Sequence, residues 1–156
     1  MPIGPIVRLR PEHLNQLEAL LASNDLPVED CAEQGDIFYG IFDQDELIAA
    51  GGLEAAADHS LLRSIVVKPH YRGRGLGRAL AEFLLAQARS QGRVAVYLLT
   101  ESAAEYFEKL GFSHVARAHV PAAIASTRQF ASLCPDSASC LMTDLSRDWP
   151  RLTEPR

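Results

Sequence analysis

The chain has 156 residues, the length of a single domain, and its 47% hydrophobic and 22% charged residues are typical of a soluble globular protein. This composition excludes a disordered, collagen-like or coiled-coil chain. The 20 acidic and 15 basic residues give a net charge of −5, which gives no support for nucleic acid as a partner.

The first sixty residues predict a strand, two helices and a hairpin. Residues 6–10 alternate apolar and basic side chains, as an edge strand does. A helix opens at Pro11, with leucines spaced along one face, and a short second helix is expected within 27–34. Residues 37–42 and 46–53 predict two strands joined by a tight turn.

The rest of the chain alternates strand and helix patterns. The expected elements are a strand at 61–67, a glycine-rich loop at 72–77, a helix from 79 to about 92, a strand at 94–99, a helix at 102–110, a strand at 112–116, a short helix at 121–126 and a strand at 140–145. This order predicts an α+β fold: one domain with a mixed, mostly antiparallel sheet of about six to seven strands and helices on both faces.

The cysteine content and the first residues indicate a reducing compartment. Three cysteines are too few, and odd in number, for a secreted disulfide framework. Residues 1–5 do not form a charged segment followed by an apolar one, and no apolar run could span a membrane. We therefore expect a cytoplasmic protein without a membrane partner. No paired C-x-x-C spacing occurs, so no metal is expected.

A loop of glycines and arginines, Arg72-Gly73-Arg74-Gly75-Leu76-Gly77-Arg78, separates a predicted strand from a predicted helix. Glycines let the backbone turn sharply and approach a ligand. Cations at the positive end of a helix are unfavourable unless an anion is bound there, so the loop predicts a phosphate-bearing ligand. The loop lacks the Lys-Ser/Thr pair of a P-loop, and the dinucleotide fingerprint would require glycine at Arg78.

Two motifs resemble the GNAT family of N-acetyltransferases. Val67-x-Pro69-x-Tyr71-Arg72-Gly73-x-Gly75-x-Gly77 resembles the family's acetyl-CoA loop, and Thr100-x-x-Ala103-x-x-x-Phe107-Glu108-Lys109-Leu110-Gly111-Phe112 is similar to its later helix and strand. The resemblance extends over nearly the whole chain, with residues 1–146 as the GNAT domain and 147–156 as a polar C-terminal tail. It implies acetyl-CoA as the co-substrate and a small-molecule amine as the acceptor.

The second half of the chain resembles a narrower group. Residues 97–100 and 129–140 are similar to a GNAT subfamily associated with arsenic resistance, itself similar to the acetyltransferase domain of N-acetylglutamate synthases. This resemblance implies that the amine of a small amino acid or amino-acid-like compound attacks the thioester directly. The alternatives are a protein N-acetyltransferase, a non-catalytic acyl-CoA sensor and a thiol-based binder of arsenicals through Cys134 and Cys140, with Cys31 as a third thiol. A homodimer is also left open, since many relatives dimerise.

The resemblance assigns cofactor contacts to two segments and one later residue. The backbone of the strand end would hold the pantetheine arm, the loop amides would hold the pyrophosphate, and Thr100 stands where an asparagine often contacts the arm. The expected cofactor-binding residues are Ile65, Val66, Val67, Arg72, Gly73, Arg74, Gly75, Leu76, Gly77, Arg78 and Thr100. A backbone N–H near Val66 would stabilise the oxyanion.

The catalytic groups depart from the common family pattern. An amine with a pKa of about 10 is mostly protonated at pH 7, so a carboxylate that collects its proton is expected. Glu54, at the end of an apolar strand, is the first choice, with His119 second and a solvent-exposed acid as the alternative reading. Many relatives carry a glutamate at the position that Leu61 holds in this chain. The tyrosine that protonates the thiolate in many relatives is Phe107, and neighbouring Tyr106 points about 100° away around the helix.

Two arginines are candidates for binding a substrate carboxylate. Arg63 lies inside an otherwise apolar strand, where a guanidinium must find an acceptor or reach solvent. Arg128, near the C-terminal loop, is the second candidate. Either could hold a carboxylate through two parallel hydrogen bonds. The alternative for both is a solvated surface arginine.

Overall fold

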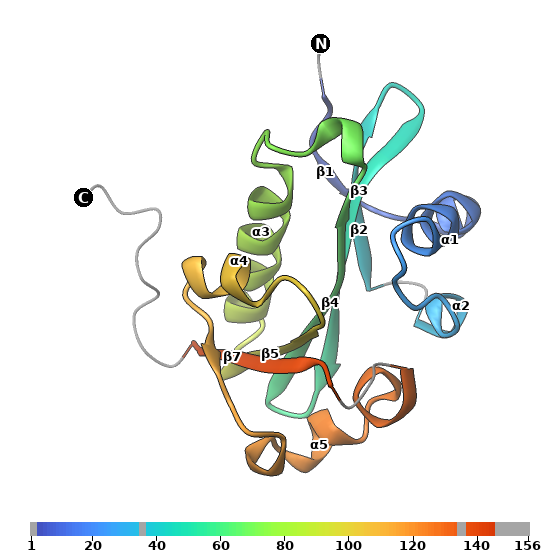
Figure 1. Cartoon of the computed structure of the whole chain (residues 1–156). Coiled ribbons are helices and arrows are strands. Elements are labelled where there is room, and N and C mark those ends of the chain that lie inside the picture. Colours follow the sequence, from blue (N-terminus) through green and yellow to red (C-terminus); the bar gives the residue numbers. More distant parts are fainter. Residues whose placement is uncertain (1–2, 35–36, 134–136, 146–156) are drawn as a thin grey trace. The chain divides into compact units, whose positions relative to one another are not determined.

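The computed structural model describes residues 3–34, 37–133 and 137–145. Seven strands form one mixed sheet in the order β1-β2-β3-β4-β5-β7-β6, and helices flank it (Figure 1). The strands are β1 (Ile6–Arg8), β2 (Phe38–Asp43), β3 (Glu46–Ala56), β4 (His59–Val67), β5 (Ala95–Thr100), β6 (Ser113–His114) and β7 (Ser139–Asp144). The predicted α+β fold with a mixed sheet is confirmed.

The helices include several single turns. The α-helices are α1 (Leu14–Ala22), α2 (Cys31–Gln34), α3 (Leu76–Ser90), α4 (Ala104–Lys109) and α5 (Ala122–Ala125). Short 3-10 turns are η1 (Pro11–His13), η2 (Pro69–Tyr71) and η3 (Arg117–His119), and η4 (Gln129–Leu133) is a π-helix. None of the helices in the described ranges combines the length and apolar content of a membrane span.

Several predicted boundaries were wrong for identifiable reasons. The helix expected from Pro11 begins with the 3-10 turn η1 and becomes α-helical at Leu14. β4 begins at His59 because residues 59–61 pair in parallel with β5. The strand expected at 112–116 is reduced to β6, because the register with β7 extends over Ser113 and His114. The proposed tail at 147–156 lies outside the described residues.

The chain divides into two compact units, and the first contains Met1–Glu54 and Leu62–Leu84. In it, β1, β2 and β3 pair antiparallel, with Tyr39 opposite Gly51. Apolar side chains from α1 and α2 pack with Phe38 in one cluster, and Leu80 of α3 packs with Ile48 in another. Figure 1 shows α1 and α2 on one side of these strands and α3 on the other. The prediction of helices on both faces is therefore confirmed in this unit.

The second unit contains Ala55–Leu61 and Leu85–Arg156. β5 pairs antiparallel with β7 along its whole length, from Ala95 opposite Asp144 to Thr100 opposite Ser139. Residues 95–98 of β5 are all buried. This agrees with the near-continuous apolar pattern of that segment, which predicts a strand covered on both faces.

Candidate active site

An irregular residue divides β4. Ser64 has a φ of 60°, a left-handed conformation that residues with a Cβ rarely adopt. The Arg63 guanidinium lies over the Phe38 ring, and Val66 packs in the cluster that contains Phe38, whereas Ile65 packs with the α3 cluster. Residues three apart thus share a face, where a regular strand would place residues two apart. Residues 65–67, expected to bind the pantetheine arm, follow directly after this irregularity.

The glycine-rich loop has the geometry expected for binding a phosphate group. Gly73 and Gly75 have φ values of 82° and 81°, and a Cβ built on either would meet no other atom within 4 Å. α3 begins at Leu76, so the amides of its first turn have no acceptor within the helix. Open space beside free amide donors at a positive helix end suits the pyrophosphate of a CoA-type ligand.

Arg72 fastens this loop to the rest of the first unit. Its Nε donates to the carbonyl oxygen of Val67 over 2.9 Å, and its Nη2 donates to Oδ1 of Asn24 over 2.5 Å. The side chain nevertheless stays exposed. Its guanidinium therefore has a role in holding the loop as well as the phosphate contact expected from the sequence.

The other two arginines of the loop also have partners within the chain. The Arg74 guanidinium lies 5.1 Å from the ring centroid of Tyr71, whose hydroxyl donates to Oδ2 of Asp43 over 2.6 Å. The hydrogen bond to Asp43 raises the pKa of Tyr71. Arg78 donates from Nε to Glu82 over 2.9 Å. The backbone amides are thus the loop donors most directly available to a phosphate.

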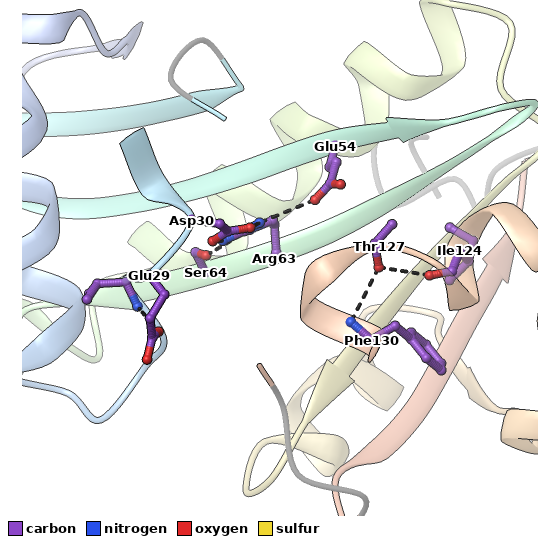
Figure 2. A network of polar contacts seen from close by, with 9 residues as sticks. Glu29, Asp30, Glu54, Arg63, Ser64, Ile124, Thr127 and Phe130 are labelled. Carbon is purple, nitrogen blue, oxygen red and sulfur yellow. Dashed lines mark hydrogen bonds and ion pairs between the residues drawn. The ribbon is translucent and has the colours of Figure 1, made fainter. Parts of the chain in front are cut away.

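A buried network joins three charged residues of the first unit (Figure 2). Arg63 donates from Nη1 to Oδ2 of Asp30 over 2.6 Å and from Nη2 to Oδ1 over 2.7 Å. The same Nη1 lies 3.2 Å from Oε1 of Glu54, and Nε lies 3.2 Å from Oγ of Ser64. The side chains of Arg63 and Asp30 are 1% and 0% exposed, and that of Glu54 is 12% exposed.

The network excludes the alternative reading of Glu54 and Arg63 as solvated surface residues. Burial alone would lower the pKa of Arg63, but the hydrogen bonds and negative charges of Asp30 and Glu54 outweigh it and raise that pKa. The guanidinium is occupied by an internal carboxylate in the paired geometry that we expected a substrate carboxylate to use.

Gly52 makes room for the network. A Cβ at this position would lie 2.9 Å from the Phe38 ring and 3.4 Å from Cγ of Arg63. The Arg63 guanidinium is centred 5.4 Å from the centroid of the same ring. The aromatic ring and the arginine stem therefore pack over a bare backbone on β3, two residues before Glu54.

Asp30 is the residue of the network that sequence reasoning missed. It lies directly before α2, 33 residues from its partner Arg63. One aspartate in a polar stretch carries no pattern that distinguishes it from a surface acid. The available signal was indirect: a buried arginine in an apolar strand requires a carboxylate somewhere in the fold.

Thr100 and the α4 residues belong to the second unit. Oγ1 of Thr100 accepts the backbone N–H of Ala103 over 2.9 Å, which leaves its own hydroxyl hydrogen to donate elsewhere. Phe107, at the common tyrosine position, is 7% exposed and packs edge-on against Phe112. Tyr106 is 39% exposed. The structure thus gives Phe107 a packing role.

The remaining polar candidates of the second unit lie at its surface. His119 in η3 and Arg128 before η4 are both exposed. They differ in this from Glu54 and Arg63 of the first unit, whose side chains are almost fully buried. Within the described residues, no group of three or more His, Cys, Asp or Glu side chains could hold a metal ion.

Two of the three cysteines have side chains that the structure describes. Cys31 is 0% exposed in the first unit and Cys140 is 4% exposed in the second. Burial raises the pKa of each thiol to about 11. Neither is therefore a ready thiolate for a soft ion at neutral pH. Cys134 lies outside the described residues.

These thiols are expected to react slowly while the chain is folded. At pH 8 a pKa of about 11 leaves on the order of one thiolate in a thousand, against about one in ten for a free thiol of pKa 9. In a Cys134→Ser background, we expect Cys31 and Cys140 to label with a thiol reagent much faster in urea than in buffer, and native labelling to accelerate as the pH rises toward 11. Equal rates in urea and buffer would contradict the burial of both side chains.

The fold and the loop give a strand–loop–helix junction whose geometry suits a phosphate-bearing ligand. A sequence model of the acetyltransferase (GNAT) domain matches residues 34–114, about half of the chain and the part that holds the loop and Glu54. The chain belongs to the GNAT family of acetyltransferases.

Individual relatives show what this domain resembles. The amino-acid acetyltransferase of Pseudomonas fluorescens is 35% identical over 82 residues, which cover 51% of this chain and 19% of that protein. The glucosamine 6-phosphate N-acetyltransferase of Trypanosoma brucei brucei is 44% identical over 59 residues, 37% of each chain. The chain thus spans well under half the length of these curated relatives.

A solved structure supports the fold. The N-acetylglutamate synthase of Neisseria gonorrhoeae, complexed with coenzyme A and N-acetyl-glutamate, superposes with a TM-score of 0.81 at 17% identity. The alignment covers 94% of this chain and 36% of that protein. At this identity the likeness concerns the fold alone.

Proposed function

We propose that the chain acetylates the amino group of a small amino acid or amino-acid-like compound. The observation that carries this substrate class is the 82-residue similarity to the amino-acid acetyltransferase. The proposal includes a cytoplasmic location and, from the resemblance of residues 97–100 and 129–140, amino-acid-like arsenicals among the acceptors. A homodimer is the proposed assembly.

We assign proton removal to Glu54. The acceptor amine is mostly an ammonium ion at pH 7, and only its neutral form has a free electron pair for attack. The Glu54 carboxylate is fixed by Arg63 and has an exposed fraction of 12%, so it combines a set orientation with access. It accepts one ammonium proton, as a general base does.

The donor supplies the acetyl group as a thioester, held by the amides of the glycine-rich loop and by the backbone of residues 65–67. The nitrogen–carbon bond forms as the carbon–sulfur bond breaks, and the second proton lost by nitrogen goes to the departing thiolate. A thiol pKa of about 8.5 makes that thiolate a good leaving group. Phe107 in place of the common tyrosine is compatible with this step.

We assign the substrate carboxylate to Arg128. Arg63 has its paired N–H groups on Asp30 and is 1% exposed, which leaves Arg128 as the other arginine proposed from the sequence. Arg128→Ala is expected to raise the KM of a carboxylate-bearing amine about 10- to 100-fold, the usual loss for a hydrogen bond between charged groups. The same amine without its carboxylate should show no change. The matched control is Arg89→Ala at an exposed position of α3; if it has the same effect, Arg128 is not specific.

Glu54→Gln is expected to lower kcat/KM about 10²- to 10⁴-fold, the range for loss of a general base. The ratio to the unmodified chain should be largest at low pH, where little neutral amine exists without a base. Acetyl-CoA affinity, measured by calorimetry, should be unchanged. Glu46→Gln, at the other end of β3, is the control. Equal rates for Glu54→Gln and the unmodified chain across pH would remove Glu54 from the reaction.

The test of the function is thiol release from acetyl-CoA with a panel of acceptors. The panel holds the common amino acids, amino-acid-like phosphinates and arsenicals, glucosamine 6-phosphate and peptides with free N-termini. Release with the amino-acid class supports the proposal, and release with peptides or the amino sugar alone replaces it. No release, with acetyl-CoA still raising the Tm, would favour the acyl-CoA sensor.

A further inference from the structure

We propose that Asp30 and Arg63 are positioning residues that hold the Glu54 carboxylate ready for proton transfer. The inference rests on the proposed function, because it assigns these residues a role through Glu54. Asp30 comes from the segment before α2, Arg63 from β4 and Glu54 from β3, and they meet in one network (Figure 2).

The plane of the Arg63 guanidinium is fixed. Two parallel hydrogen bonds of 2.6 and 2.7 Å join it to Asp30, and both side chains are almost fully buried. A guanidinium held in this paired way cannot rotate without breaking both bonds. The second N–H of Nη1 therefore has a set direction, and it meets Oε1 of Glu54 at 3.2 Å.

The network also carries a net charge. Asp30 already neutralises the Arg63 cation at short distance, and the contact to Glu54 is 0.5 Å or more longer than either contact to Asp30. The three charges sum to −1, so a negative charge remains for the network. Of its three side chains, Glu54 has the largest exposure, 12% against 0% and 1%. The carboxylate that can meet an ammonium ion is therefore oriented without being neutralised.

Other titratable groups lie around the pair. Cys31 is next to Asp30 in the sequence. Burial raises the pKa of its thiol, the charge of Arg63 lowers it, and the charges of Asp30, Glu18 and Glu29 raise it. Glu54 forms an ion pair with Arg63, which in turn is paired with Asp30. Removal of the charge at residue 30 or at residue 63 therefore changes the net charge of the network in opposite directions.

The test compares the acidic limb of the kcat/KM pH profile across variants. Arg63→Met removes a positive charge from the network, so the limb should move to higher pH. Asp30→Asn removes a negative charge from the network, so the limb should move to lower pH. In Asp30→Asn/Arg63→Met the limb should return close to its original place, while kcat stays roughly 10-fold or more below the unmodified chain because the carboxylate is no longer held.

Two further variants separate positioning from stability. Arg63→Lys keeps the charge but loses the paired geometry, so it should fold, leave the limb in place and still lower kcat about 10-fold. Leu17→Ala weakens the same side of the first unit, where Leu17 is 2% exposed, without touching the network. It should lower the Tm and leave kcat unchanged when assayed well below that temperature.

A measurement without turnover distinguishes this inference from the proposed function. The Glu54 carboxyl can be titrated by carbon NMR in the protein without acetyl-CoA, in the unmodified chain and in the variants at residues 30 and 63. Opposite displacements of its midpoint support the network even if every amine in the panel fails, which would sink the proposed function alone. Midpoints that do not move, or NMR displacements with an unmoved kcat/KM profile in an active enzyme, overturn the inference.

Discussion

Gly75→Trp is expected to abolish acetyl-CoA binding and to leave the fold intact. Gly75 lies in the loop before α3, with a φ of 81° and no other atom within 4 Å of a Cβ built on it. An indole placed there would fill the space that the loop amides face. Loss of two charge-assisted hydrogen bonds would weaken binding roughly 100-fold or more. Calorimetric titration with acetyl-CoA measures the loss.

The matched control for this change is Gly92→Trp. Gly92 has nearly the same φ, 80°, and equally open surroundings, but it follows the end of α3 and lies outside the loop. Both variants carry the same backbone strain, of about 1–2 kcal/mol for a side chain in this conformation, and should lose similar Tm. Normal acetyl-CoA affinity in Gly75→Trp would show that the loop assignment is wrong.

Asp30→Ala is expected to lower the free energy of unfolding by about 3–5 kcal/mol, the usual cost of leaving a buried charge without its partner. Arg63 would keep Glu54 at 3.2 Å but would lose both short hydrogen bonds in a site where it is 1% exposed. Urea unfolding followed by circular dichroism measures the change. A loss under 1 kcal/mol would mean that Asp30 does not compensate Arg63.

An exposed ion pair provides the comparison. Glu46 pairs with Lys68, and their side chains are 49% and 40% exposed, so Glu46→Ala should cost less than about 1 kcal/mol. The double variant Asp30→Ala/Arg63→Met should be more stable than Asp30→Ala alone, because the uncompensated cation is gone. If the double variant is less stable than Asp30→Ala, the buried charge is not the cause of the loss.

Local patterns were sufficient to predict most of the fold. The glycines between a predicted strand and a predicted helix indicated a sharp turn, and Gly73 and Gly75 have the positive φ values that such a turn requires. The anion site at this turn stays a prediction. The apolar run at 94–99 predicted β5 and its covered faces, since burial on both sides requires such a run.

The features that escaped prediction depend on contacts distant in sequence. Asp30 acquires its role only when β4 brings Arg63 to it. Ser64 adopts a left-handed conformation that its residue type does not predict, and its neighbours Ile65 and Val66 pack in different clusters. The π-helix at residues 129–133 follows a polar segment without helical periodicity. Sequence could propose Glu54, but it could not show what orients it.

The loop before α3 is tied to the first unit before any ligand arrives. Arg72 fastens it to Val67 and Asn24, and Tyr71, which leads into it, is bound to Asp43. A binding loop that is already ordered loses little conformational entropy when its ligand docks. Side chains outside the loop, such as those of Asn24 and Asp43, are therefore expected to strengthen acetyl-CoA binding by restricting the unliganded state.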